Sequence, residues 1–246
     1  MTLRRPLIAV FGALALSGSF LFAACGGDDG DSGSASATFD TKKADDLAHQ
    51  ALLTVKDLPG KGWEVTEEDE LDESDLPDTK NCKPITDGKA RAKELMAGKK
   101  KAETQRKIER DGPESVTEIE PEVTVLDTAK TASLSLAEAK KAYDGDGFVA
   151  CFQETLAGPD APKGVKFVTT VAKAGTSAPN GGIAKAADIT ISDGKNRLDL
   201  HTETYIWVYR NAGFQVTLSG DKADVTPELA KAAVTAVQKN AEKLAK

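Results

Sequence analysis

The chain has 246 residues, of which 29% are charged and only 5% are aromatic, and its formal net charge at pH 7 is −7. An acidic chain without a basic stripe does not fit nucleic-acid binding, and it has no electrostatic attraction to anionic lipid. The length allows one substantial domain or two small ones.

The first 24 residues are arranged as an export signal. Arg4 and Arg5 form a short positive region, an uncharged and largely apolar run covers residues 6–22, and two alanines precede Cys25. This is the layout of a signal peptide with small residues at its cleavage site. A plain secreted protein and a single-pass membrane protein are the alternatives, but the run is about the minimum for a span and no basic cluster follows it.

The segment LFAAC at residues 21–25 resembles the lipobox of bacterial lipoproteins, with Phe22 at the position where lipoboxes usually have leucine. The resemblance implies cleavage between Ala24 and Cys25 and attachment of diacylglycerol, with palmitate-type acyl chains, to the Cys25 sulfur. It therefore implies a protein anchored by lipid to the extracytoplasmic face of the cell membrane.

Residues 25–39 are predicted to be the lipidated cysteine and a tether. Residues 26–38 contain only Gly, Asp, Ser, Ala and one Thr, so they have no apolar surface to bury. A flexible segment of this length has a reach of roughly 20 Å. We therefore predict a signal peptide at residues 1–24, a tether at 25–39 and a single α+β extracytoplasmic domain at 40–246, whose membrane contact is the lipid on Cys25.

The remaining two cysteines, Cys82 and Cys151, form an even pair in an exported chain, which predicts one disulfide. Closing a loop of about 70 residues would stabilise the fold by about 4 kcal/mol in the chain-entropy model. Metal ligation and redox chemistry are alternatives, but there is no CxxC motif, and neither His49 nor His201 has ligand spacing to a cysteine. We expect no metal and no cofactor.

The predicted domain begins with a helix. Apolar residues recur at helical spacing over residues 47–55, where Asp40 or Thr41 can cap the helix and Pro59-Gly60 ends it. A short strand is predicted from Trp63.

Three polar stretches follow. Residues 67–78 are strongly acidic but lack the glycine and the alternating ligands of a calcium loop, so we interpret them as a solvated loop. Residues 87–98 predict a short helix with Leu95 and Met96 on one face. Residues 99–111 are nearly all polar, and we interpret them as an exposed helix or loop.

Alternating apolar residues predict a strand over residues 115–127, and helices are expected at 134–143 and 148–156. The C-terminal third then alternates with the period of strands, with turn signals at Asp193-Gly194 and at residues 211–213. These features predict an antiparallel meander of about four strands with one buried face.

A C-terminal helix completes the predicted α+β fold. Thr226 is a suitable N-cap and Pro227 a suitable first helical residue. Six apolar residues form one stripe, which should pack on the open face of the meander. They are Leu229, Ala233, Val234, Val237, Ala241 and Leu244.

The order of these elements resembles a known group of domains. ALLTVKDLPGKGWEV at residues 51–65, two cysteines beyond it, and a meander ending in YIWVYRNAGFQVTLSG at 205–220 before a C-terminal helix carry the resemblance. It is to the sensor-type extracytoplasmic domains of actinobacterial cell-surface lipoproteins and of some mycobacterial serine/threonine kinases. The resemblance implies an antiparallel sheet flanked by helices, similar to PsbP-like lipoproteins, and names no ligand.

The sequence contains no GxSxG, HExxH, GxGxxG or Walker motif. His49 and His201 are the side chains with ordinary pKa values near neutrality, and both are expected to face solvent. We therefore predict no catalytic residue and a chain that is not an enzyme.

Three aromatic residues, Tyr205, Trp207 and Tyr209, share one face of one predicted strand. If Ile206 and Val208 face the core, the three aromatic rings form a surface stripe that could contact a ligand. If helices cover both faces of the sheet, the rings are buried instead.

The features together favour a non-catalytic binding or sensing module of the cell envelope, for a small ligand, a cell-wall component or an envelope protein. Two alternatives stay open. One is a carboxylate-based envelope hydrolase or transferase, which requires a cleft with at least two convergent acids of shifted pKa. The other is a scaffold for another envelope protein, which requires an exposed apolar patch.

Overall fold

The computed structural model describes residues 40–68, 76–112, 115–144, 147–158 and 161–244. The predicted signal peptide (1–24), the lipidation site Cys25 and the tether (25–39) lie outside the described residues. So does most of the acidic segment at 67–78.

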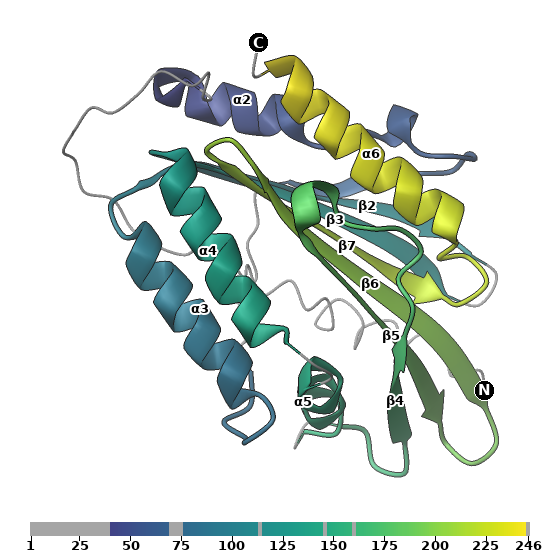
Figure 1. The fold of residues 1–246 in the computed structure, drawn as a ribbon. Helices are drawn as coiled ribbons and strands as arrows, with labels where there is room; N and C mark the ends of the chain where they lie inside the picture. Colours follow the sequence, from purple (N-terminus) through teal and green to yellow (C-terminus); the bar gives the residue numbers. More distant parts are fainter. Residues whose placement is uncertain (1–39, 69–75, 113–114, 145–146, 159–160, 245–246) are drawn as a thin grey trace.

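Seven strands form one fully antiparallel sheet in the order β1-β2-β3-β7-β6-β5-β4 (Figure 1). It consists of an N-terminal meander, β1–β3, and a C-terminal meander, β4–β7, which are joined by the pairing of β3 with β7. The predicted four-stranded C-terminal meander is therefore confirmed. The strands are β1 (Glu64–Glu68), β2 (Lys100–Asp111), β3 (Val116–Leu126), β4 (Lys166–Ala172), β5 (Ile183–Ser192), β6 (Arg197–Tyr209) and β7 (Ala212–Asp221).

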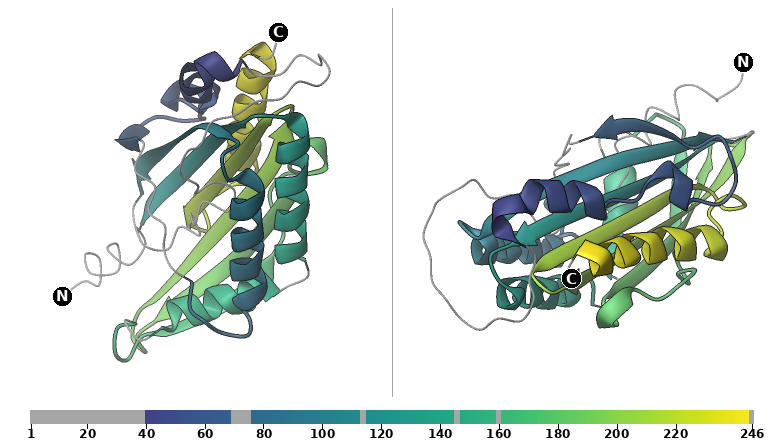
Figure 2. Two further views of the ribbon diagram at one scale, coloured as in Figure 1. Left: turned by 90° about the vertical axis from the view of Figure 1, so that its left-hand side faces the viewer. Right: turned by 90° about the horizontal axis from the view of Figure 1, so that it is seen from above.

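Helices cover both faces of this sheet, which gives three layers (Figures 1 and 2). One face carries α2 (Ala44–Ala51) and α6 (Pro227–Leu244), and the other carries α3 (Lys83–Met96), α4 (Ala129–Ala142) and α5 (Gly147–Leu156). Short 3-10 turns occur at Thr41–Lys43, Val55–Asp57 and Pro179–Gly181. The predicted α+β class, with flanking helices and the C-terminal helix on the sheet, is confirmed.

The face under α2 and α6 carries one large apolar cluster. The Thr226 hydroxyl accepts a hydrogen bond from the Leu229 amide at 3.2 Å and so caps α6, as predicted. The apolar stripe of α6 packs in one cluster with Trp207 and Phe214, whose rings stack with centroids 5.5 Å apart.

The opposite face is divided. Under α4 and α5, strands β4–β6 contribute an apolar cluster that includes Ile189, Leu200 and Ile206. On β3 the residues of the same face are Glu118, Glu120 and Glu122, because their pairing partners on β7 are Ser219, Thr217 and Gln215. This half of the face is therefore polar, although helices lie on that side of the sheet.

Residues 99–111 correct the sequence interpretation, because residues 100–111 form strand β2 and not an exposed helix or loop. The strand pairs with β3 along its length, and its residues 106–109 also pair with β1, so backbone hydrogen bonds hold it in the sheet. Its buried residues Ala102, Thr104 and Ile108 point to the α2/α6 face. Three apolar or small residues in twelve were too few to reveal this periodicity.

The first helix also ends earlier than expected. α2 stops at Ala51, and Leu52 and Leu53 continue as buried extended residues. Thr54 and Asp57 then form a capping box around the short turn Val55–Asp57, whose hydrogen bonds compete with continuation of the helix.

Candidate functional site

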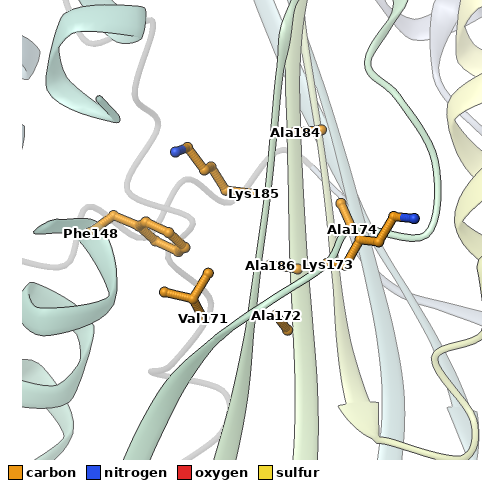
Figure 3. A pocket seen from close by; sticks show the side chains of 8 residues that line it. All are labelled: Phe148, Val171, Ala172, Lys173, Ala174, Ala184, Lys185 and Ala186. Carbon is orange, nitrogen blue, oxygen red and sulfur yellow. The ribbon is translucent and has the colours of Figure 1, made fainter. Parts of the chain in front are cut away.

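A pocket of about 350 Å³ lies where β4 leaves the sheet (Figure 3). Phe148 of α5 forms one wall, and residues 171–174 and 184–186 form the others. Lys185 lies over the Phe148 ring, with its Nζ 5.5 Å from the ring centroid. The volume suits a small ligand, and the lining has two lysines but no carboxylate, thiol or imidazole. The pocket therefore provides no acid–base pair.

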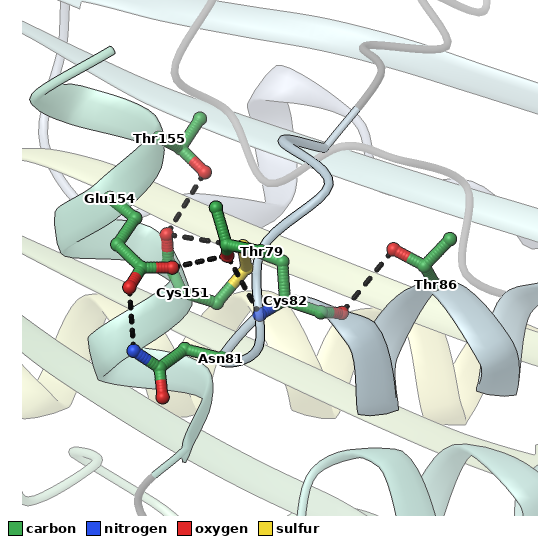
Figure 4. Close-up of a disulfide and its surroundings, with 7 residues drawn as sticks. All are labelled: Thr79, Asn81, Cys82, Thr86, Cys151, Glu154 and Thr155. Carbon is green, nitrogen blue, oxygen red and sulfur yellow. Dashed lines mark hydrogen bonds between the residues drawn. A yellow bond between two sulfur atoms is a disulfide. The ribbon is translucent and has the colours of Figure 1, made fainter.

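Cys82 and Cys151 are joined in a disulfide with an S–S distance of 2.11 Å and a Cα–Cα distance of 4.5 Å (Figure 4). The bond connects the start of α3 to α5, and both residues are fully buried. Glu154 of α5 accepts hydrogen bonds from Thr79 and from Asn81, the latter at 2.6 Å. These contacts also hold the residues just before α3 against α5. The pairing expected from the cysteine count is the one in the structure.

The predicted aromatic surface stripe is not formed, because both faces of β6 are covered. Tyr205 and Trp207 are completely buried, and Ile206 on the other face is completely buried as well. The Trp207 indole donates a hydrogen bond to Gln238 of α6 at 2.9 Å. Tyr209 is partly exposed, with the Arg210 guanidinium 5.3 Å from its ring centroid. Tyr205 and Trp207 are core residues and do not offer a surface to a ligand.

His201 is buried, contrary to the expectation that it faces solvent. Its Nδ1 lies 2.7 Å from Asp188, and its Nε2 lies 2.9 Å from Glu203. Both neighbours are carboxylates, so the ring is best satisfied as an imidazolium that donates from both nitrogens. Burial acts to lower the pKa of His201, but the hydrogen bonds to Glu203 and Asp188 outweigh it and raise the pKa.

The network extends from solvent into the core. Lys222 contacts the second oxygen of Asp188 at 2.6 Å, and the Tyr205 hydroxyl donates to Glu203. The Gly175 amide donates to Glu203 at 2.9 Å, and the Thr176 amide donates to the Tyr205 oxygen at 3.2 Å. We call Asp188, His201, Glu203, Tyr205 and Lys222 the histidine network; it ties the segment after β4 to the sheet. His49, by contrast, is exposed as expected.

A second buried polar cluster lies on the opposite face of the sheet. We call Glu118, Glu120 and Glu122 the acidic row; they alternate along β3 on the face that carries α3, α4 and α5. The exposed fraction is 7% for Glu118 and 4% for Glu122, and Glu120 is partly buried. Each of the three has one buried carboxylate oxygen without a hydrogen-bond partner. Unpartnered buried polar atoms are rare in native structures.

The electrostatics of the acidic row disfavour ionisation. Burial, and then the charge of neighbouring Glu118, raise the pKa of Glu120 to about 7. Burial, and then Glu103, raise the pKa of Glu122 to about 8. Burial also raises the pKa of Glu118, although Lys107 opposes this effect. At neutral pH the row therefore holds protons that surface glutamates have lost.

Lys107 of β2 supplies a counter-charge at one end of the row. Its Nζ lies 3.0 Å from Glu109 and 3.5 Å from Glu118. Burial acts to lower the pKa of Lys107, but the hydrogen bond to Glu109 and the charges of Glu118, Glu109 and Glu67 raise it. The other oxygen of Glu118 and one oxygen each of Glu120 and Glu122 have no hydrogen-bond partner.

The sequence carries one signal for the acidic row. TEIEPEV at residues 117–123 alternates glutamate with other residues inside a predicted strand. Such alternation usually marks the solvent face of a half-buried strand. Only the arrangement of the helices and neighbouring strands shows that this glutamate face is enclosed.

Neither a metal centre nor a membrane span is evident in the described parts of the chain. The described residues include no group of three or more His, Cys, Asp or Glu that could hold a metal ion. Within the same residues, no helix combines the length and hydropathy that crossing a membrane requires.

Comparison with known proteins yields a similarity of structure but not of sequence family. No family model matches the chain, and no curated protein matches it. Among solved structures, the chain is similar to the extracellular domain of PknH from Mycobacterium tuberculosis, with 12% sequence identity and a TM-score of 0.48. The match covers 82% of this chain and 96% of that one. A similarity of this degree does not assign a function.

Proposed function

We propose that the chain is a lipid-anchored, extracytoplasmic binding module without catalytic activity, and that the acidic row is its ligand site. The observation that carries the proposal is the unpartnered carboxylate oxygen on each of Glu118, Glu120 and Glu122. A buried acceptor without a partner costs about 1–3 kcal/mol. A ligand that supplies hydrogen-bond donors would remove this cost, and the free energy recovered would favour binding.

The lipid on Cys25 supplies the location in this proposal. The lipobox-like segment at residues 21–25 and the polar tether at 25–39 would hold the domain at an r.m.s. distance of roughly 20 Å from the membrane surface. The acidic charge of the chain speaks against nucleic acid as a partner. A small ligand, a cell-wall component or an envelope protein fits such a location.

Native mass spectrometry of the full chain, extracted from the membranes of a bacterium that processes lipoproteins, tests both parts. We expect a mass that includes diacylglycerol on the N-terminal Cys25, and a non-covalent adduct that is lost in Glu122→Gln. The matched control is Glu228→Gln, which removes one exposed carboxylate from α6 on the other side of the sheet. A mature mass without acyl groups would contradict the anchor, and identical adduct profiles in all three proteins would contradict the binding site.

A carboxylate-based hydrolase or transferase is the second candidate function. It is favoured by the raised pKa values of Glu120 and Glu122, because a general acid must hold its proton near neutral pH. These glutamates are two residues apart on one strand, so their backbone positions are about 6–7 Å apart. A glycan or peptide substrate that the wild type cleaves and Glu120→Gln does not would establish this alternative over the non-catalytic one.

A further inference from the structure

The charges around the acidic row are unbalanced. Among the described residues, the groups whose charges act most strongly on its three glutamates come from β1, β2, β3 and α3. They comprise six carboxylates, counting the row itself, but three ammonium groups. The carboxylates are Glu67, Glu103, Glu109, Glu118, Glu120 and Glu122, and the ammonium groups are Lys89, Lys100 and Lys107.

Two of the three lysines already contact carboxylates of this group. Lys107 binds Glu109 and Glu118, and Lys100 contacts Glu103 at 2.7 Å. Lys107 acts on Glu120, and Lys100 and Lys89 act on Glu122, through their charges, but the unpartnered oxygens of the two glutamates accept no hydrogen bond. An ionised carboxylate accepts hydrogen bonds and donates none, so the missing complement is a cationic donor.

The geometry of the row distinguishes an extended cation from a single metal ion. Alternate residues of a strand are about 6–7 Å apart, so the row is a line of three carboxyl groups along β3. A metal ion needs oxygen ligands that converge to about 2.0–2.6 Å from one point. A linear arrangement instead suits several ammonium groups spaced along a chain, and about four methylene groups between nitrogens match the repeat of the strand.

Uncharged neighbours complete the site. Thr217 and Gln215 on β7 are paired with Glu120 and Glu122 in the sheet, and both are almost fully buried. Side chains of this kind contact the methylene or amine groups of a ligand without adding charge.

Resting on the proposed function, we infer that the acidic row binds a linear diamine or polyamine. One ammonium group contacts Glu122 and the next contacts Glu120. Each ammonium group donates to an oxygen that otherwise has no partner, and the methylene groups between them lie along β3.

Binding of this kind is linked to protons. The ammonium groups favour the ionised forms of Glu120 and Glu122, whose pKa values of about 7 and about 8 leave them mostly protonated below neutrality. Each bound ammonium group therefore displaces a proton. Affinity should rise more than about tenfold from pH 6 to pH 8, because the diamine itself stays charged in this range while the row ionises.

Isothermal titration calorimetry of the full chain with 1,4-diaminobutane and with spermidine tests the inference. We expect binding with proton release, detected as a dependence of the measured heat on the ionisation heat of the buffer. Glu120→Gln and Glu122→Gln should each weaken binding by about tenfold to a hundredfold, since each removes one charged hydrogen bond. Glu228→Gln, with the same change in net charge, should leave the affinity unchanged, and 1,4-butanediol should not bind.

Two results would overturn the inference: failure of both amines to bind, or binding that Glu120→Gln and Glu122→Gln leave unchanged. Equal binding of 1,4-butanediol would also overturn it, because it would show recognition of a neutral chain. A Glu122-dependent adduct in native mass spectrometry, with no amine binding, would disprove this ligand class while leaving the proposed function intact. Thermal unfolding of each variant identifies any loss of fold.

Discussion

The histidine network and the acidic row are both buried polar clusters, and they lie on opposite faces of the same sheet. In the histidine network, His201 lies between two carboxylates, and Glu203 accepts from a tyrosine hydroxyl and a backbone amide as well. In the acidic row, each glutamate has an oxygen without any partner. Buried polar groups can therefore have two roles. A cluster whose members are hydrogen-bonded to one another stabilises the fold, whereas a cluster with unpartnered acceptors can accept hydrogen bonds from a ligand.

The largest effect is expected from Glu203→Ala in the histidine network. Removing this acceptor leaves the Nε2 of His201, the hydroxyl proton of Tyr205 and the Gly175 amide without an acceptor in a nearly dry environment. Unfolding in urea should show a loss of about 3–5 kcal/mol, which is the range for breaking a buried ion pair. Glu122→Ala is the comparison from the row and should cost much less, because its free oxygen accepts no hydrogen bond. Equal losses would remove the distinction between the clusters.

Cys82→Ser with Cys151→Ser should destabilise the chain by about 4 kcal/mol, because the disulfide closes a loop of 69 residues. Urea unfolding measures this effect, with the wild type under reducing conditions as a second comparison. The crosslink joins α3 to α5 on the face of the acidic row. The NMR signals of the His201 ring, on the other face, should therefore not move; if they do, the two faces are not independent.

Glu122→Gln should stabilise the chain at pH 8 by up to about 4 kcal/mol, because the variant removes the cost of ionising Glu122 in the folded state. The pKa of Glu122 is raised from 4.5 to about 8 in the folded state, so the folded state holds a proton that the unfolded state releases. The free energy of unfolding therefore falls as pH rises from about 4.5 to about 8, at up to about 1.4 kcal/mol per pH unit for this group.

The measurement is urea unfolding of wild type and Glu122→Gln at several pH values from 4 to 9. The two curves should converge near pH 4 and separate above it, with the variant more stable. Glu228→Gln serves as the control and should follow the wild type. A variant that loses stability at every pH would show that Glu122 is a partnered structural residue, like those of the histidine network.

The smallest effect concerns the titration of His201. Its pKa is raised above 6.5 by Glu203 and Asp188, so the stability it contributes is fully present below pH 6.5 and is lost as pH rises through the folded pKa. An NMR titration should give a midpoint above 6.5, and Asp188→Asn should lower that midpoint. A midpoint below 6.5 in the wild type would mean that the network is held by a neutral ring.

The sequence predicted most of the helices and strands but neither of the two buried polar clusters. The predicted helices at 134–143 and 148–156, the strand at 115–127 and the C-terminal meander all correspond to elements of the structure. These segments have periodic apolar residues or strong turn signals. The clusters were missed, because alternation of polar and apolar residues shows which residues share a face but does not show whether that face is covered.

Strand β2 is an element that the sequence pattern did not reveal. Its sequence KKAETQRKIERD has little apolar periodicity, and its place in the sheet comes from pairing with β1 and β3. β-propensity depends strongly on such neighbours, so a polar segment becomes a strand when both of its edges are occupied.

The sequence by itself determined what depends on local chemistry. The cap at Thr226, the periodicity of α6 and the meander follow from residues close together in the chain, and the expected lipidation of Cys25 rests on a segment of five residues. Tertiary structure decided the burial of Tyr205, Trp207 and His201 and the enclosure of Glu118, Glu120 and Glu122. Burial depends on which helix or strand covers a given face, and those contacts join residues far apart in the sequence.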